Sequence, residues 1–164
     1  MIFTDKIESK IYSLHELLKR IEFWRTLGDK IVFTNGCFDI LHQGHIHLLA
    51  SCSQLGDRVI VGLNADTSVK ELKGSSRPVN NQQSRAILLA ATQFVDAVIL
   101  FEESTPENLI HAIKPDVLVK GGDYTEKTIV GAEFVKSYGG EVAIIPFVEN
   151  FSTSKIIEKI NKVN

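Results

Sequence analysis

The residues of this sequence best suited to chemistry are two histidines, His42 and His45, which flank Gln43 and Gly44. They directly follow an apolar run and open a segment with helical spacing, so both would lie in one helical turn as neighbours. The N–H groups of a helix N-terminus favour phosphate, and a glycine between the histidines lets a ligand approach the backbone. A single histidine here would more simply be a core residue, but the pair, the glycine and the position favour phosphate chemistry.

Other chemistries fit this segment less well. A metal site would need a third ligand, and the glutamate of an HExxH motif is missing. The turn Asn35-Gly36-Cys37-Phe38-Asp39 lacks the GxGxxG pattern of dinucleotide-binding proteins, and the P-loop signature is also missing. The helix dipole and the histidines therefore remain as the groups that would handle phosphate.

A second group of candidate residues lies in the connection 65–80, sixteen residues in which we expect no helix. Its cations, together with one early in the following helix, are Lys70, Lys73, Arg77 and Arg85. Clustered lysines and arginines bind phosphate oxygens through charge-assisted hydrogen bonds. Asp66 and Glu71 offset part of the charge, so composition alone leaves a solvated surface loop equally open.

Two further segments combine hydroxyl groups, glycines and cations. Phe151-Ser152-Thr153-Ser154-Lys155 opens the last expected helix, where hydroxyl residues are ordinary N-caps. A lysine in that first turn is opposed by the helix dipole by ~0.3–1 kcal/mol, and a bound polyphosphate would reverse the sign. Lys120-Gly121-Gly122-Asp123-Tyr124 follows a strand, and its paired glycines allow a close approach to a base or ribose, although a simple turn also explains them.

Short apolar runs alternate with helical patterns along the chain. We expect strands at 30–35, 58–64, 96–101, 116–120 and 141–146, and helices at about 14–27 and 45–55, in the 87–94 connection, from near 106 and 131, and at the end. This alternation predicts an α/β fold, a doubly wound, Rossmann-like five-stranded parallel sheet with helices on both faces. Ligands of such sheets bind outside the carboxyl ends of the strands. In the last helix we expect Ile156, Ile157 and Ile160 to form a buried stripe.

The composition fits one domain, which we expect to span 1–164 with 1–29 as an N-terminal helical extension. Hydrophobic residues make up 44% and charged residues 23%, and the formal charge of −2 argues against a nucleic-acid surface over the whole molecule. Neither a bilayer-spanning run nor a signal sequence is evident, so we expect a cytoplasmic protein without membrane contact. We expect Cys52 to be a buried thiol and Cys37 to fill space beside the site.

The segment HQGH resembles the HxGH signature of the nucleotidyltransferase superfamily that includes the cytidylyltransferases and phosphopantetheine adenylyltransferase. The longer string VFTNGCFDILHQGHIHLL is similar to the D-glycero-β-D-manno-heptose 1-phosphate adenylyltransferases of lipopolysaccharide precursor synthesis. The likeness covers nearly the whole chain and includes VGLNADTSVKELKG, RPVN, DVLVKGGDY, GAEFV and STSKIIEKI. Several matches in the same order make chance agreement improbable.

The resemblance implies direct attack of a sugar 1-phosphate on the α-phosphorus of ATP, with Mg²⁺ on the triphosphate. It implies catalysis by His42, His45 and Lys73. It implies nucleotide binding by Thr34, Asn35, Gly36, Cys37, Phe38, Gly44, His45, Asn64, Lys120, Gly121, Asp123, Ser152, Thr153, Ser154 and Lys155. It implies contacts of the acceptor with Asp39, Lys70, Lys73, Arg77 and Arg85.

Several alternatives stay open at the level of sequence. A cytidylyltransferase acting on glycerol 3-phosphate or another polyol phosphate shares the fold and the HxGH motif. A non-catalytic nucleotide-binding module is a different class of answer. The N-terminal helix could pack within the chain or form a homodimer interface, through Leu14, Leu17, Leu18, Ile21 and Trp24. The heptose adenylyltransferases that this chain resembles include the second domain of a bifunctional enzyme, whose first domain is a sugar kinase. The resemblance therefore implies that a separate heptose kinase and a phosphatase work with this chain.

Overall fold

Five parallel strands in the order β3-β2-β1-β4-β5 form the centre of the computed structural model, which describes residues 3–146 and 151–162. The strands are β1 (Ile31–Gly36), β2 (Arg58–Asn64), β3 (Ala97–Phe101), β4 (Val117–Gly121) and β5 (Glu141–Ile145). The helices are α1 (Phe3–Glu8), α2 (Leu14–Thr26), α3 (Gln43–Cys52), α4 (Asp66–Lys73), α5 (Gln82–Ala90), α6 (Glu107–Ile113), α7 (Ala132–Ser137) and α8 (Thr153–Asn161), with a 3-10 turn η1 (Glu126–Thr128). The predicted doubly wound parallel sheet is confirmed.

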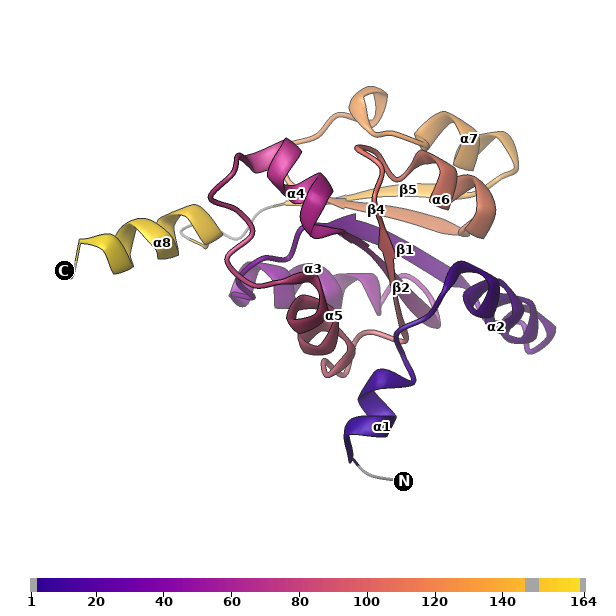
Figure 1. Ribbon diagram of the computed structural model, residues 1–164. Coiled ribbons are helices and arrows are strands. Elements are labelled where there is room, and N and C mark those ends of the chain that lie inside the picture. Colours follow the sequence, from indigo (N-terminus) through magenta and orange to yellow (C-terminus); the bar gives the residue numbers. More distant parts are fainter. Residues whose placement is uncertain (1–2, 147–150, 163–164) are drawn as a thin grey trace.

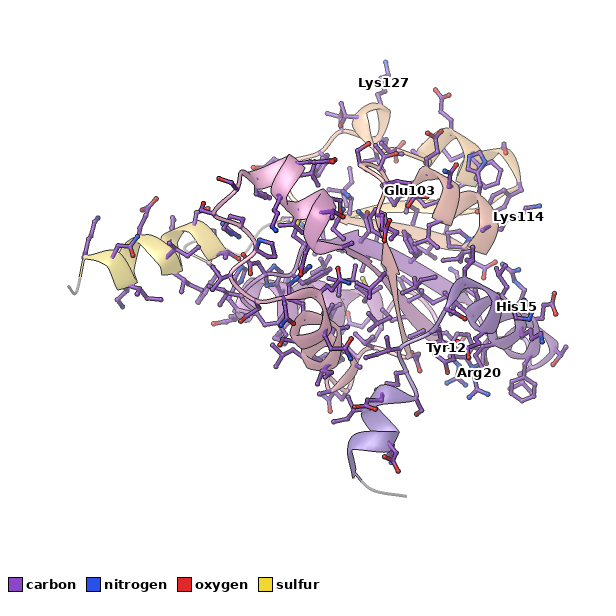
Figure 2. The ribbon with its side chains drawn as sticks, viewed as in Figure 1. Tyr12, His15, Arg20, Glu103, Lys114 and Lys127 are labelled. Atoms are coloured by element: carbon purple, nitrogen blue, oxygen red, sulfur yellow. The ribbon has the colours of Figure 1, made fainter. Side chains whose placement is uncertain are left out.

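Helices cover both faces of the sheet (Figure 1). Side chains alternate along β1, so Ile31 and Phe33 join one core with α2, α6 and α7, while Val32 joins the other with α3 and α5. Within α2, Leu17, Ile21 and Trp24 are buried, so this helix packs inside the chain. Tyr12, His15 and Arg20 lie at the end of the molecule opposite α8 (Figure 2).

The strand order reverses between β1 and β4, and this switch point fixes where a ligand can bind. The chain leaves β1 towards β2 on one side and returns later as β4 on the other, so the loops diverge above these two carboxyl ends. Thr34 pairs with Val119 in register, which places Asn35 next to Lys120 at the divergence. The sequence motifs expected to bind phosphate thus border one region.

Two expectations about helices are wrong. The connection 65–80 contains α4, which the sequence pattern did not show because the helix has only eight residues and buries only Ser68 and Val69. In α8 no residue is buried, and Ile160 is 55% exposed, so the expected buried stripe is absent. Its isoleucines have the right spacing, but Ile156 and Ile157 are only partly buried and Ile160 is exposed.

The edge strand β3 is covered by the segment between α1 and α2. Ile11 forms a parallel bridge with Val98, and the Val98 backbone exchanges hydrogen bonds with Lys10 and Tyr12. In the described ranges, 3–146 and 151–162, no helix has the length and apolar character that crossing a membrane requires.

Candidate active site

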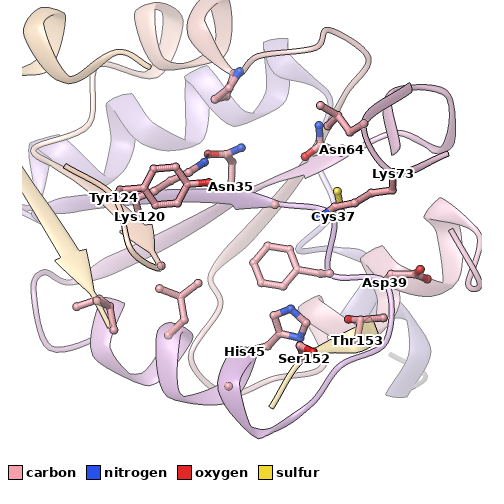
Figure 3. Close-up of a pocket in the computed structure, with 18 of the residues that line it drawn as sticks. Asn35, Cys37, Asp39, His45, Asn64, Lys73, Lys120, Tyr124, Ser152 and Thr153 are labelled. Carbon is pink, nitrogen blue, oxygen red and sulfur yellow. Dashed lines mark hydrogen bonds between the residues drawn. The ribbon is translucent and has the colours of Figure 1, made fainter. Parts of the chain in front are cut away.

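A cavity of about 590 Å³ opens at the switch point, above the carboxyl ends of β1 and β4. Most residues predicted for the site line this cavity: Asn35, Gly36, Cys37, Phe38, Asp39, His42, Gly44, His45, Asn64, Lys73, Arg77, Lys120, Gly121, Ser152, Thr153 and Ser154. Figure 3 shows side chains from β1, α3, α4, β4 and the start of α8 around it. Segments more than 100 residues apart in sequence therefore meet at one place.

The two histidines are held face to face at the start of α3. Their rings stack with centroids 3.8 Å apart. The backbone N–H of His42 donates to Nδ1 of His45 at 3.4 Å, so the remaining proton of a neutral His45 ring lies on Nε2. A Cβ on Gly44 would come within 3.1 Å of the His42 ring, so glycine makes room for this stacking. The Nδ1 atom of His42 is buried without a hydrogen-bond partner in the described structure.

Both imidazoles are neutral near pH 7. Burial, and secondly the neighbouring His42, lowers the pKa of His45 to about 4. Burial also lowers the pKa of His42. A neutral imidazole donates one N–H, which suits hydrogen bonding to a phosphoryl oxygen without adding a buried charge.

Phe38 supports His45 from a strained position. Its φ of 45° lies in the left-handed region, which a bulky residue rarely adopts. Its ring is buried and lies 5.1 Å from the His45 ring between centroids. Backbone strain of this kind persists where the surroundings fix it, and here it places an aromatic wall against the histidine.

Asp39 fixes the segment that brings Arg77 to the cavity. Its carboxylate accepts from Nε of Arg77 at 2.5 Å and from the backbone N–H groups of Val79 and Asn80 at 2.8 and 2.9 Å. Burial alone would raise the pKa of Asp39, but these backbone bonds and Arg77 outweigh it and hold the pKa below its usual value. Both oxygens of Asp39 thus accept hydrogen bonds within the protein, and Asp39 positions Arg77 at the cavity.

Arg85 does not reach the cavity, in contrast to its expected role as a phosphate ligand. Its side chain has no exposed area, and its guanidinium donates to the carbonyl oxygens of Asn80, Cys37 and Asn64 and to the Asp66 carboxylate. Because these bonds join the ends of β1 and β2 to the starts of α4 and α5, Arg85 braces the floor of the site. Its position among other cations in the sequence gave no sign of this burial.

Four other predicted residues also lie outside the cavity lining. Thr34 is fully buried, and Lys70, Asp123 and Lys155 are exposed away from it. At the start of α8, the Ser152 side chain accepts from the Lys155 backbone N–H, so the predicted N-cap is present. Thr153 donates to the Ile40 carbonyl at 3.5 Å, which connects α8 to the loop before the histidines.

Two cysteines behave as expected. Cys52 is fully buried, and burial raises its pKa to about 12. Cys37 is half-buried at the cavity wall, where burial raises its pKa despite the positive charge of Lys73, which extends towards it (Figure 3). Neither thiol has the lowered pKa of a nucleophile.

Sequence reasoning missed one side of the cavity. Its lining there comprises Ser104, Thr105, Pro106, Leu118, Thr128, Ile129 and Val130. The first three follow β3 at its carboxyl end, so the rule that ligands bind at carboxyl ends could have found them. The residues around η1 carry no motif, and only the fold brings them over the sheet.

The sequence pattern of the cytidylyltransferase-like family matches residues 33–159. The chain belongs to this family. The bifunctional protein HldE of Koribacter versatilis is 55% identical over 152 residues, which cover 93% of this chain and 31% of that protein. The bifunctional protein HldE of Campylobacter fetus is 58% identical over 153 residues, covering 93% and 32%. The chain therefore spans about a third of the length of these relatives.

Two solved structures share the fold of this chain. The lipopolysaccharide core biosynthesis protein from Thermoplasma volcanium is 29% identical, with a TM-score of 0.58, covering 76% of this chain and all of that one. Pantoate-beta-alanine ligase from Francisella tularensis, solved with a nucleotide, has a TM-score of 0.57 over 89% of this chain and 75% of its own. At 18% identity the latter shows a shared fold alone.

Proposed function

We propose that this chain transfers AMP from ATP to D-glycero-β-D-manno-heptose 1-phosphate, giving ADP-heptose and pyrophosphate. The observation that carries the proposal is the stacked, neutral pair His42 and His45 at a helix N-terminus inside the switch-point cavity. Such a site is built to bind phosphoryl oxygens. The choice of sugar is supported by the ordered motifs and by the identity to HldE proteins.

In this reaction a phosphate oxygen of the sugar 1-phosphate attacks the α-phosphorus of ATP. The new P–O bond forms as the bond to the bridging oxygen breaks, and pyrophosphate leaves with that electron pair. The protein has to align the reactants and stabilise the charge that spreads over the α-phosphoryl group. His42 and His45 would donate to the α-phosphate and to the bridging oxygen.

The remaining lining residues divide between the two substrates. Ser152, Thr153 and Ser154 would bind the β- and γ-phosphates through hydroxyl and backbone N–H groups at the start of α8. Lys73 and Arg77 would bind the acceptor phosphate or the departing pyrophosphate. Lys70 and Lys155 would contribute only through longer-range charge, because both side chains are exposed outside the lining.

Mg²⁺ would enter with ATP. The described residues contain no cluster of three or more acidic, histidine or cysteine side chains that could hold a metal ion. Among the described lining residues Asp39 is the one carboxylate, and it already accepts three hydrogen bonds. Mg²⁺ bound by triphosphate oxygens and water fits these residues, and its charge would offset that of the phosphates. The protein's own contribution then rests on its N–H donors and cations.

A substrate matrix tests the proposal. Pyrophosphate release would be measured with ATP or CTP against heptose 1-phosphate or glycerol 3-phosphate. We expect release from ATP with heptose 1-phosphate. Turnover only with CTP and a polyol phosphate would overturn the substrate assignment, and binding without any pyrophosphate release would indicate a non-catalytic module.

A further inference from the structure

Lys120 is a cation in the cavity wall, and no carboxylate of residues 3–146 or 151–162 pairs with it. Its ammonium donates to Oδ1 of Asn35 at 2.9 Å and lies 5.6 Å from the centre of the Tyr124 ring. None of the ion pairs between described residues includes it. Burial lowers its pKa, as expected for a charge removed from water. A partly buried cation whose described partners are neutral favours the binding of an anionic ligand nearby.

The contact with Lys120 also decides which way the Asn35 amide points. An amide has an oxygen that accepts and a nitrogen that donates, whereas an ammonium only donates. The oxygen of Asn35 must therefore face Lys120, which leaves the NH₂ group as the other end of the amide. Asn35 lines the cavity, and Figure 3 shows its side chain next to Lys120.

The strands on either side of β1 place the Asn35 side chain. A Cβ on Gly62 of β2 would come within 3.3 Å of the Asn35 Cβ, so the base of this side chain lies close to β2. Lys120 lies on the β4 side, and its hydrogen bond sets the polarity of the amide.

We propose that Lys120 is a positioning residue that holds the Asn35 amide so that its nitrogen donates to a phosphoryl oxygen of the bound nucleotide. The inference rests on the proposed function. It adds that the Asn35 amide contacts the nucleotide through its nitrogen, as a hydrogen-bond donor. Lys120 lies on the β4 side of the cavity, whereas Lys73 approaches from α4, so the two lysines act on different parts of the ligand (Figure 3). Asn35 touches the ligand, and Lys120 acts through it.

The test compares Lys120→Met, Lys120→Arg, Asn35→Asp, Asn35→Ala and the double variant Asn35→Ala/Lys120→Met with the wild type. Lys127→Met is the matched control, because Lys127 is exposed and points away from the cavity (Figure 2). Binding of inorganic tripolyphosphate is measured by calorimetry, KM for ATP and kcat by pyrophosphate release, and folding by the thermal midpoint.

We expect Lys120→Met and Asn35→Asp to bind tripolyphosphate at least ~10-fold more weakly, the value of one charge-assisted hydrogen bond. KM for ATP should rise by about the same factor with kcat changed less than about threefold, because the contact binds ground and transition states alike. Lys120→Arg, which still only donates, should recover part of the loss. Thermal midpoints should stay within about 2 °C, since no native ion pair is broken.

Three results would overturn the inference. One is tripolyphosphate affinity within about twofold of the wild type in Lys120→Met or Asn35→Asp. The other is additivity, in which Lys120→Met costs as much affinity in the Asn35→Ala background as in the wild type. Unfolding of Lys120→Met would also count against it, because a structural role would then explain the residue. A wild type that binds tripolyphosphate but makes no ADP-heptose would contradict the proposed function instead.

Discussion

The stacked histidines carry most of the chemistry that we assign to this chain. Neutral rings can donate to the α-phosphoryl group as its charge grows, and removing such a donor typically lowers turnover by ~10²–10³-fold. We expect His42→Ala to lower kcat by this factor while ATP affinity changes far less, measured by pyrophosphate release and calorimetry. His47→Ala, on the exposed side of α3, is the matched control. A His42→Ala rate within a few-fold of wild type would exclude the assignment.

The lowered pKa values of the histidines also predict how stability depends on pH. His45 has a pKa of about 4 in the folded chain, and an unfolded histidine has one of about 6.5, so the unfolded state binds protons first. The contribution of the buried neutral rings to the free energy of unfolding is fully present above pH ~6.5. It is lost as the pH falls towards ~4. We expect the denaturation midpoint to fall across this window in the wild type and less in His45→Gln. Equal slopes for the two proteins would contradict the burial of His45.

Arg85 shows how a single buried residue can organise several elements. Replacing it with Met would leave three carbonyl groups and Asp66 without their donor, and breaking such a network costs about 3 kcal/mol or more. We expect this loss in chemical denaturation of Arg85→Met, with only partial recovery in Arg85→Lys because an ammonium cannot reach all four acceptors. The exposed Arg20→Met serves as the control. Unchanged stability together with lost phosphate binding would restore the ligand role expected from sequence.

At the scale of elements, α8 combines a binding role with little contribution to the core. Its first turn lines the cavity, while none of its residues is buried. We expect a chain ending at residue 150 to keep the thermal midpoint of the full chain but to lose most of its ATP affinity, measured by calorimetry. A large drop in the midpoint would mean that the isoleucine face of α8 is covered after all.

The segment before α2 protects an edge of the sheet. Lys10 and Tyr12 satisfy the Val98 backbone, and the Lys10 ammonium donates to the carbonyl oxygens of Thr92 and Val95. An uncovered edge strand is a template for pairing with other chains. We expect a chain lacking residues 1–12 to self-associate more than the full chain, as measured by light scattering after size exclusion. Identical behaviour of the two chains would show that the cover is dispensable.

For the whole molecule, the sequence predicted the sheet well because buried parallel strands are continuous apolar runs, such as RVIVGLN in β2. It predicted the histidines because two histidines three residues apart, directly after β1, indicate neighbours in the first turn of a helix. The predictions that failed concern features that depend on tertiary contacts rather than on the local sequence. The short α4 helix buries only two side chains, Arg85 is buried by acceptors from distant segments, and the residues around η1 reach the cavity only through the fold.

The measurement that tests the central claim most directly follows the phosphorus atoms of ATP. The wild type is incubated with heptose 1-phosphate and ATP labelled at either the α- or the β-phosphate, and the products are separated. Transfer of AMP predicts the α label in ADP-heptose and the β label in pyrophosphate. If the β label appeared in the sugar product, or if neither label left ATP while CTP reacted, the chain would not be the adenylyltransferase proposed.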